Sequence, residues 1–177
     1  MAFRAELEDF GAFYERTYPA AYRTAWAILR DQAAATDAVQ DAYLAAYRER
    51  GRFRGDAPAR SWLLRIVVNR VFAELRRARP HQLEIDLEGG PAAPGDDFAR
   101  ATDHVSLDAA MRVLDPRARA AIVLCYYNDL DHAGIAAILG TNANNVGVII
   151  HRALERLQRE MGRADDLTEQ LQEVRHG

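Results

Sequence analysis

The sequence predicts an all-α protein with two small helical domains joined by a flexible acidic linker. Along most of the 177 residues, apolar side chains recur at every third or fourth position, which is the period of amphipathic helices. Residues 81–105 break this pattern with Gly and Pro clusters and with 6 acidic residues against 1 Arg. Such a composition is typical of linkers and lets two domains move independently. We expect a three-helix bundle over 1–80, the linker over 81–105, a helix-turn-helix domain over 106–162 and a polar tail over 163–177.

The first helix is expected over Glu8–Leu29. Its repeating apolar positions are largely aromatic, among them Phe13 and Trp26, and an aromatic stripe at helical spacing is more often core than ligand site. Pro19 lies inside this pattern, where it removes a backbone donor and can kink the helix.

The second helix is expected over Gln32–Arg50, with Asp31 or Thr36 as its N-cap. One side carries small apolar residues and tyrosines. The other side is acidic and polar and includes Asp37, Gln40, Asp41 and Glu49. This polar side is either ordinary solvated surface or a docking face for a basic partner.

An arginine-rich loop and helix complete the first domain. The run Gly55-Asp56-Ala57-Pro58 is turn chemistry, and Pro58 suits the first turn of a helix. A helix of about 20 residues follows, with Arg65, Asn69, Arg70, Arg76 and Arg77 off its apolar side. Arginines pair with phosphates, an amide reads a base edge, and loop aromatics stack on an unpaired base. An amphipathic helix with a solvated arginine face explains the same composition.

The second domain ends in a pair of helices with the helix-turn-helix form. A short helix starts near Ser106, and Asp115-Pro116 begins the next one. The first helix of the pair ends at Gly140, where a left-handed cap is needed. Asn144 or Asn145 is expected to cap the second, whose first residues would face the major groove. Any tight pair of antiparallel helices has similar spacing. The tail either extends the last helix or frays.

Composition excludes several classes of protein. The net charge of −3 argues against a generally basic nucleic-acid binder, although residues 1–80 hold 14 Arg against 10 acidic residues, an excess of +4. The single cysteine, Cys125, lies in the apolar run AAIVLCYY and is expected to be a buried structural thiol. The apolar runs are too short to cross a membrane, and the first residues lack a secretory apolar core. We expect a cytoplasmic protein without membrane insertion.

Motifs of enzymes and of metal sites are missing from the sequence. We find no phosphate-binding glycine loop, GxSxG or HExxH motif, and the five histidines lie apart, without ligand spacing. We therefore expect no enzyme activity, no metal and no cofactor, so that the function to be explained is binding.

Two stretches resemble one known family. The run DAVQDAYLAAYRERGRFRGDAPARSWLLRIVVNRVFAELRR resembles region 2 of bacterial sigma factors of the extracytoplasmic-function type, in the sigma-70 family. The run LDPRARAAIVLCYYNDLDHAGIAAILG, with HRALERLQ after the turn, resembles region 4. The resemblance covers nearly the whole chain apart from the linker and tail. It implies a sigma factor that directs core RNA polymerase to promoters, with promoter DNA, as duplex and melted strand, and an anti-sigma factor as further partners.

The resemblance also implies roles for particular residues. Asp37, Gln40 and Asp41 would dock on the clamp helices of the largest polymerase subunit. Phe53, Arg54, Gly55 and Asp56 would capture a flipped base of the minus-ten element. Trp62, Arg65 and Asn69 would hold the melted strand and the edge of the upstream duplex. Arg70, Arg76 and Arg77 would contact phosphates, and Arg60 is expected among the DNA-binding residues as well.

The last helix departs from the usual family sequence at its start. Gly147, Val148 and Ile149 stand where Lys, Ser and Arg are usual, and exposed apolar side chains cannot pair with phosphates or guanine edges. The remaining polar candidates for DNA binding are Asn142, Asn144, Asn145, His151 and Arg152. We expect weakened minus-thirty-five recognition, with promoter choice resting mainly on region 2. Two alternatives remain: an apolar patch that binds a protein partner, and a helix altered so that DNA binding is weakened.

Two rival functions fit the same helices. A helix-turn-helix regulator would bind duplex DNA without polymerase, but the 6 basic and 6 acidic residues of 106–162 argue against it. A sigma-like protein could act only through protein partners. Phe53, Trp62 and Arg65 argue against this second function, because a docking protein needs no base pocket.

Overall fold

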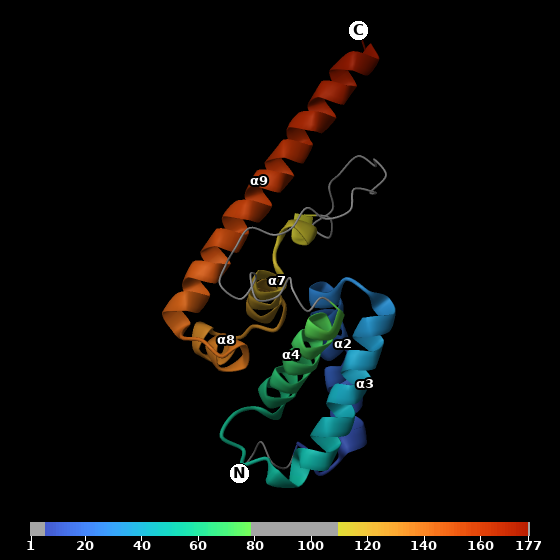
Figure 1. Cartoon of the computed structure of the whole chain (residues 1–177), viewed down its shortest axis with the longest axis vertical. Coiled ribbons are helices and arrows are strands. Elements are labelled where there is room, and N and C mark those ends of the chain that lie inside the picture. The colour runs from blue at the N-terminus through green and yellow to red at the C-terminus, as the bar shows by residue number, and fades with distance from the viewer. Residues whose placement is uncertain (1–5, 79–109, 177) are drawn as a thin grey trace.

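The structure is a computed structural model that describes the backbone of residues 6–78 and 110–176 and the side chains of 6–78 and 110–162. The expected linker, residues 81–105, lies entirely outside these ranges. We call residues 6–78 the N-terminal unit and residues 110–176 the C-terminal unit. Strands are absent from both units, and their helices (Figure 1) agree with the all-α fold expected from the sequence.

The N-terminal unit is a bundle of α2 (Phe10–Leu29), α3 (Gln32–Glu49) and α4 (Ala59–Ala78). The side chain of Asp9 caps α2 by accepting from Ala12 N at 3.0 Å. Asp31, the first of the two expected caps, caps α3 by accepting from Ala34 N at 2.8 Å. These carboxylates satisfy backbone donors that a helix start otherwise leaves unpaired. Pro19 lies within α2, which continues through it as one helix of 20 residues.

Residues 106–109 of the short helix expected near Ser106 lie outside the described residues. The C-terminal unit begins with helical Ala110 and the short 3-10 turn η2 (Met111–Val113). It continues with α7 (Pro116–Ile122), the π turn η3 (Val123–Tyr127), α8 (His132–Leu139) and α9 (Ala143–His176). Gly140 ends α8 with φ +64°, as the left-handed cap expected there. The expected caps of α9 are wrong by two or three positions, because Asn142 Oδ1 accepts from Asn145 N at 2.8 Å.

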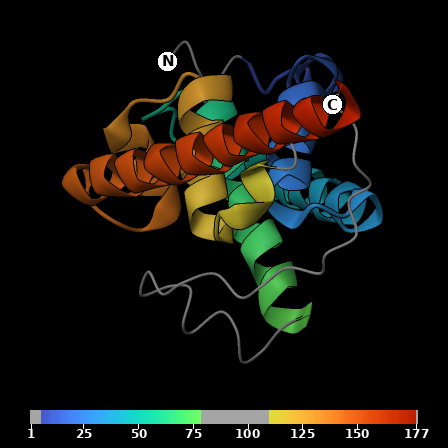
Figure 2. The ribbon, with the colours of Figure 1, turned by 90° about the horizontal axis from the view of Figure 1, so that it is seen from above.

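The last helix is much longer than the others. α9 has 34 residues and extends beyond the other labelled helices, as Figure 1 shows; seen from above, it lies across them (Figure 2). The expected boundary between helix-turn-helix domain and tail, at residue 162, therefore falls inside one helix. Among the described residues, no single helix is long and apolar enough to cross a membrane; α8 and the start of α9 pass that test only together, across a bend of 96°.

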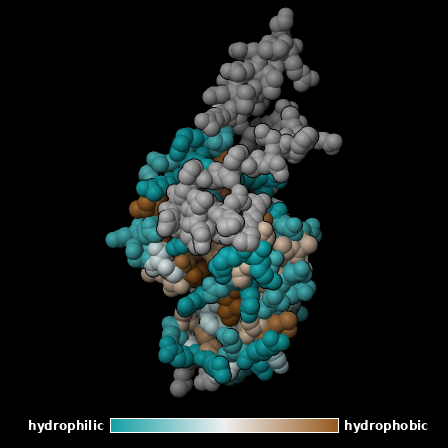
Figure 3. Space-filling model, in the orientation of Figure 1, coloured by the Kyte–Doolittle hydropathy of each residue, from teal (hydrophilic) through white to brown (hydrophobic). Residues whose placement is uncertain are grey.

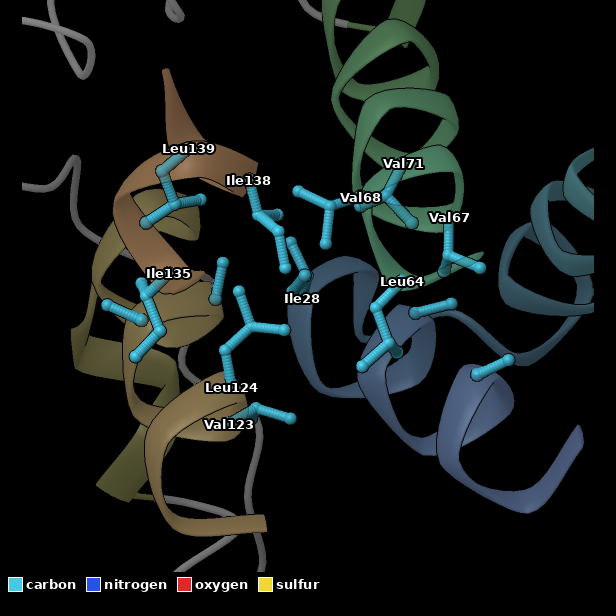
Figure 4. Packing of buried hydrophobic residues seen from close by; sticks show 14 of the residues in the cluster. Ile28, Leu64, Val67, Val68, Val71, Val123, Leu124, Ile135, Ile138 and Leu139 are labelled. Atoms are coloured by element: carbon cyan, nitrogen blue, oxygen red, sulfur yellow. The ribbon is translucent and has the colours of Figure 1, made fainter. Parts of the chain in front are cut away.

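The two units pack against each other. α7 and η3 contact α2, and α8 contacts α4. Ile138 and Leu124 point toward Ile28 and Val68 across this contact (Figure 4), and all four are buried in one hydrophobic core. The units are thus joined by apolar burial, which is the dominant favourable term in such contacts. The face seen in Figure 3 is mostly hydrophilic, with apolar residues in small separate areas.

The hydroxyl of Tyr43 is hydrogen-bonded inside the N-terminal unit. This side chain is 5% exposed, and its oxygen lies 2.7 Å from Thr17 Oγ1. Thr17 donates its own hydrogen to Phe13 O, so Tyr43 is the donor in the pair. Burial raises the pKa of Tyr43 to about 12.

We predict that stability falls as the pH rises from about 10 toward about 12. Folded Tyr43 keeps its proton in this range, whereas unfolded Tyr43, with an ordinary pKa of 10.0, loses it. Below that range the contribution is fully present. Urea denaturation of the wild-type chain and of Tyr43→Phe from about pH 9 to about pH 11.5 measures the difference. The variant should lose less stability, and equal pH dependence in both proteins would contradict the assignment.

Candidate nucleic-acid interface

The loop between α3 and α4 presents a pair of opposite charges to solvent. Arg54 and Asp56 form an ion pair of 2.9 Å, with side chains 84% and 68% exposed. Gly55, between them, has φ +78°, which favours glycine. An ion pair this exposed contributes little stability. Arg54 and Asp56 can therefore break their ion pair and bind groups of a ligand with little loss of free energy.

Phe53 is buried, unlike the charged residues that follow it. Its side chain is 7% exposed, and its ring lies against Trp62 with centroids 5.0 Å apart and planes at 39°. In this conformation Phe53 anchors the loop to α4 and cannot itself stack on a base. Trp62, which Phe53 contacts, is itself half-buried. Sequence reasoning could not separate these roles, because burial of a loop residue leaves no periodic pattern.

The arginines of α4 lie on two different sides of the helix. Arg65, Asn69 and Arg76 are exposed and fall on one stripe, at spacings of four and seven residues. Arg70 and Arg77 fall on another stripe together with Glu74, which pairs with Arg77 at 2.6 Å. We call the first set the outer stripe and the second the groove stripe.

The groove stripe faces the acidic side of α3. A surface groove between the two helices is lined by polar residues of both, including Asp37, Gln40, Asp41, Arg70, Glu74 and Arg77. Three residues expected to dock polymerase thus lie beside two residues expected to contact phosphates. Leu44, 54% exposed, lies three and four residues beyond Asp41 and Gln40 on the same side of α3. Leu44 was not among the residues predicted from the sequence, although its helical spacing places it on this side of α3.

Arg60 points away from solvent into the contact between the units. Its Nη1 donates to Asn128 O at 3.1 Å and its Nη2 to Asn128 Oδ1 at 2.9 Å. In this arrangement the guanidinium is occupied by the C-terminal unit. The expected role of Arg60 in DNA binding therefore requires a different arrangement of the two units.

The start of α9 holds a shallow hollow on the surface of the helix-turn-helix. His132, Asn144, Gly147, Val148, His151 and Arg152 line it. His132 was missed in the sequence because it belongs to α8 and reaches α9 only through the fold. A Cβ at Gly147 would lie 3.6 Å from His132 Cε1, an ordinary contact.

The polar residues of the turn are partly used by the fold itself. Asn142 caps α9, and Asn145 Nδ2 donates to Thr141 Oγ1 at 2.8 Å. The expectation that Val148 and Ile149 are both exposed is wrong in part: Val148 is 45% exposed, but Ile149 is half-buried against the core. The exposed apolar surface at this helix start is therefore smaller than expected.

The described residues offer no group of three or more His, Cys, Asp or Glu that could hold a metal ion. Cys125 is half-buried, and burial raises the pKa of its thiol above the ordinary value. A thiol is a poor nucleophile when its thiolate is disfavoured.

An all-α fold with a helix-turn-helix and an exposed arginine stripe defines a DNA-binding protein class, and comparisons with known proteins specify it. The family model for Sigma-70 region 2 matches residues 13–81, and that for Sigma-70 region 4 matches residues 104–157. The ECF RNA polymerase sigma factor SigM of Mycobacterium tuberculosis is 34% identical over 160 residues, which cover 86% of this chain and 77% of the relative. The RNA polymerase sigma-E factor of Streptomyces antibioticus is 31% identical, over 92% and 89% of the two chains.

The chain belongs to the ECF sigma factors of the sigma-70 family, which direct RNA polymerase to promoters for the initiation of transcription. Two solved structures share the fold. One is the sigma factor RpoE in complex with the anti-sigma factor NepR from Bartonella quintana, with a TM-score of 0.68 and 23% identity over 86% of this chain and 96% of that chain. The other is CnrH in complex with the cytosolic domain of CnrY, with a TM-score of 0.67 and 24% identity over 92% and 99%.

We predict that Phe53 acts on stability and Arg54 does not. Phe53→Ala removes a buried ring and should lower the free energy of unfolding by about 3 kcal/mol. Arg54→Ala removes a neighbouring exposed side chain and should change it by less than about 0.5 kcal/mol. Urea denaturation of the two variants measures both values. A Phe53→Ala variant as stable as Arg54→Ala would mean that the loop is not anchored through this ring.

Proposed function

We propose that this sigma factor recognises promoters mainly through the loop of Arg54 and Asp56 and the outer stripe of α4. The observation that carries the proposal is the position of Arg65, Asn69 and Arg76 on one exposed side of the helix that starts at this loop. Arginines on such a stripe bind phosphates, and Asn69 adds an amide able to read a base edge.

A flipped base of the minus-ten element is the ligand that the loop suits. Extruding a base costs a few kcal/mol, which stacking and hydrogen bonds in a pocket must recover. Arg54 supplies donors, Asp56 supplies acceptors, and the half-buried Trp62, in contact with Phe53 of the same loop, supplies an aromatic ring. Phe53 contributes by holding Trp62 and the loop together.

Region 4 is proposed to read the minus-thirty-five element weakly. The hollow at the start of α9 offers His132, Asn144, His151 and Arg152 to a phosphate, but Gly147 and Val148 bring no polar side chain to a base edge. Contacts of this kind hold duplex DNA without selecting its sequence.

The docking partner in the cytoplasm is proposed to be core RNA polymerase, bound through Asp37, Gln40, Asp41 and Leu44 on α3. An exposed leucine beside acidic residues suits a protein surface with an apolar centre and basic rim. Because a structural relative is a complex with an anti-sigma factor, we propose that an anti-sigma factor is a further partner.

Transcription in vitro with core polymerase on fragmented genomic DNA tests the proposed function. We expect discrete start sites that share an upstream minus-ten element. A single base change in that element should reduce initiation by about tenfold or more, whereas scrambling the minus-thirty-five position should change it by less than about threefold. Strong dependence on the minus-thirty-five sequence would contradict weak reading by region 4. Core binding without any polymerase-dependent start would favour a sequestering protein instead.

Two arginines of α4 offer a matched pair for separating the two surfaces. We expect Arg65→Ala, on the outer stripe, to weaken promoter binding by holoenzyme and to reduce its salt dependence, because one phosphate contact is lost. Arg70→Ala, in the groove stripe, should instead change the affinity for core polymerase. Fluorescence anisotropy with labelled promoter DNA and with core polymerase measures both quantities. Equal effects of the two variants on DNA would show that the groove stripe also belongs to the DNA surface.

A further inference from the structure

A buried asparagine joins the two units by hydrogen bonds. Asn128, which follows the π turn η3, is 1% exposed and contacts both α2 and α4. We propose that Asn128 locks the protein in a closed form by holding Arg60, and that DNA phosphate and Asn128 compete for this arginine. The inference rests on the proposed function in taking promoter DNA as the competitor.

The hydrogen bonds of Asn128 use every polar atom of its side chain. Nδ2 donates to Thr24 Oγ1 at 3.0 Å and to Val123 O at 3.2 Å, and Oδ1 accepts from Arg60 Nη2 at 2.9 Å. The backbone oxygen of Asn128 accepts from Arg60 Nη1 at 3.1 Å. An asparagine amide has two donor hydrogens and one acceptor oxygen, so both hydrogens and the oxygen are bonded while the protein is closed.

Thr24 fixes the orientation of this amide. Its hydroxyl hydrogen is given to Ala20 O at 2.7 Å, so Thr24 can only accept from Asn128. The amide nitrogen must therefore face α2, and the amide oxygen must face Arg60. The lock thus requires one threonine and one arginine from two different helices of the N-terminal unit.

The π turn brings Asn128 into this position. The N–H of Asn128 donates to Val123 O at 3.1 Å, five residues earlier, and Asp129 then turns the chain with φ +55°. A π turn holds one more residue than an α turn and occurs frequently at functional sites. Here the extra residue directs Asn128 toward the N-terminal unit.

When the two units separate, Arg60 loses its hydrogen bonds to Asn128 and becomes accessible to other ligands. The closed form gives this arginine two neutral oxygen atoms of Asn128. The guanidinium is charged in both cases, but a phosphate adds its own negative charge to the hydrogen bonds that it accepts, which strengthens them. Arg60 lies in the first turn of α4, on the side that faces the C-terminal unit rather than on the outer stripe, so its release adds a cation at the loop end of the helix. DNA binding therefore favours the open form, and closure weakens DNA binding to the same extent.

The second polar contact between the units is exposed and less selective. Arg23 donates to Tyr127 Oη at 2.6 Å and lies 5.0 Å from the centre of that ring. Exposed contacts of this kind contribute little because water replaces them readily. Of these two polar contacts between the units, the buried one at Asn128 is thus the one that selects the closed arrangement.

Two threonines of α2 provide a test with a matched control. Thr24 and Thr17 are both buried, and both donate to the carbonyl four residues earlier at 2.7 Å. The second partner of Thr24 is Asn128 in the other unit, whereas that of Thr17 is Tyr43 in the same unit. Thr24→Val and Thr17→Val therefore remove the same kind of group, but only Thr24→Val removes a bond between the units. Asn128→Ala is less suitable, because Asn128 also bonds to Val123 within its own unit.

The measurement is the distance between spin labels on the full chain without DNA or polymerase. In a Cys125→Ala background, Glu49→Cys and Gln158→Cys place labels on exposed residues of the two units. We expect Thr24→Val to increase the population with separated labels by about tenfold over Thr17→Val. Equal distance distributions for the two variants would overturn the lock.

Binding of a fluorescein-labelled duplex of random sequence then tests the competition, because phosphate contacts need no particular sequence. Thr24→Val should bind it several-fold more tightly than Thr17→Val, and adding Arg60→Ala should remove that gain. Separated labels with unchanged DNA affinity would overturn the competition for Arg60. A wild-type chain that supports no polymerase-dependent transcription would contradict the proposed function alone, since label distances are measured without polymerase.

Discussion

The contact between α2–α4 and α7–α8 removes Asn128 from water, and the arrangement of the two units depends on satisfying that side chain. Apolar residues such as Ile28, Val68 and Ile138 supply buried area across the contact (Figure 4), but apolar area is not directional. Asn128 adds direction, because its hydrogen bonds to Thr24 and Arg60 exist only in one alignment of the helices. A buried amide without its partners is costly, so small shifts of one unit over the other are disfavoured.

Helix α4 has chemically distinct sides, and each suits a different kind of partner. One side enters the core of the bundle, the outer stripe carries Arg65, Asn69 and Arg76, and the groove stripe lies beside the acidic side of α3. Arg60, in the first turn, faces the other unit. Position around the helix, more than the number of arginines, thus determines which surface of the protein each charge lies on.

Local patterns in the sequence predicted the helices, the cap at Asp31, the stop at Gly140 and the helix-turn-helix, because spacing and capping depend on neighbouring residues. The sequence could not predict that Phe53 is covered by Trp62, or that Arg60 binds Asn128, because both contacts depend on how distant segments pack. The division of the arginines into two stripes was available from helical spacing, but the acidic neighbours of Arg70 come from the packing of α3. The cap of α9 was misplaced because four polar residues adjoin that helix start and any of them has suitable chemistry.

Thr17 and Thr24 lie seven residues apart, two helical turns, on the same side of α2. Each threonine donates its hydroxyl hydrogen to a carbonyl of α2 and accepts a hydrogen bond from another element. The donor to Thr17 is Tyr43 in the same unit, and the donor to Thr24 is Asn128 in the C-terminal unit. The rotation of α2 about its axis therefore fixes two hydrogen bonds at the same time, one to Tyr43 of α3 and one to Asn128 of the C-terminal unit. Insertion or deletion of one residue between the two threonines would turn them about 100° apart and break one of these alignments. Between these two threonines, α2 thus tolerates substitutions at exposed positions but not insertions or deletions.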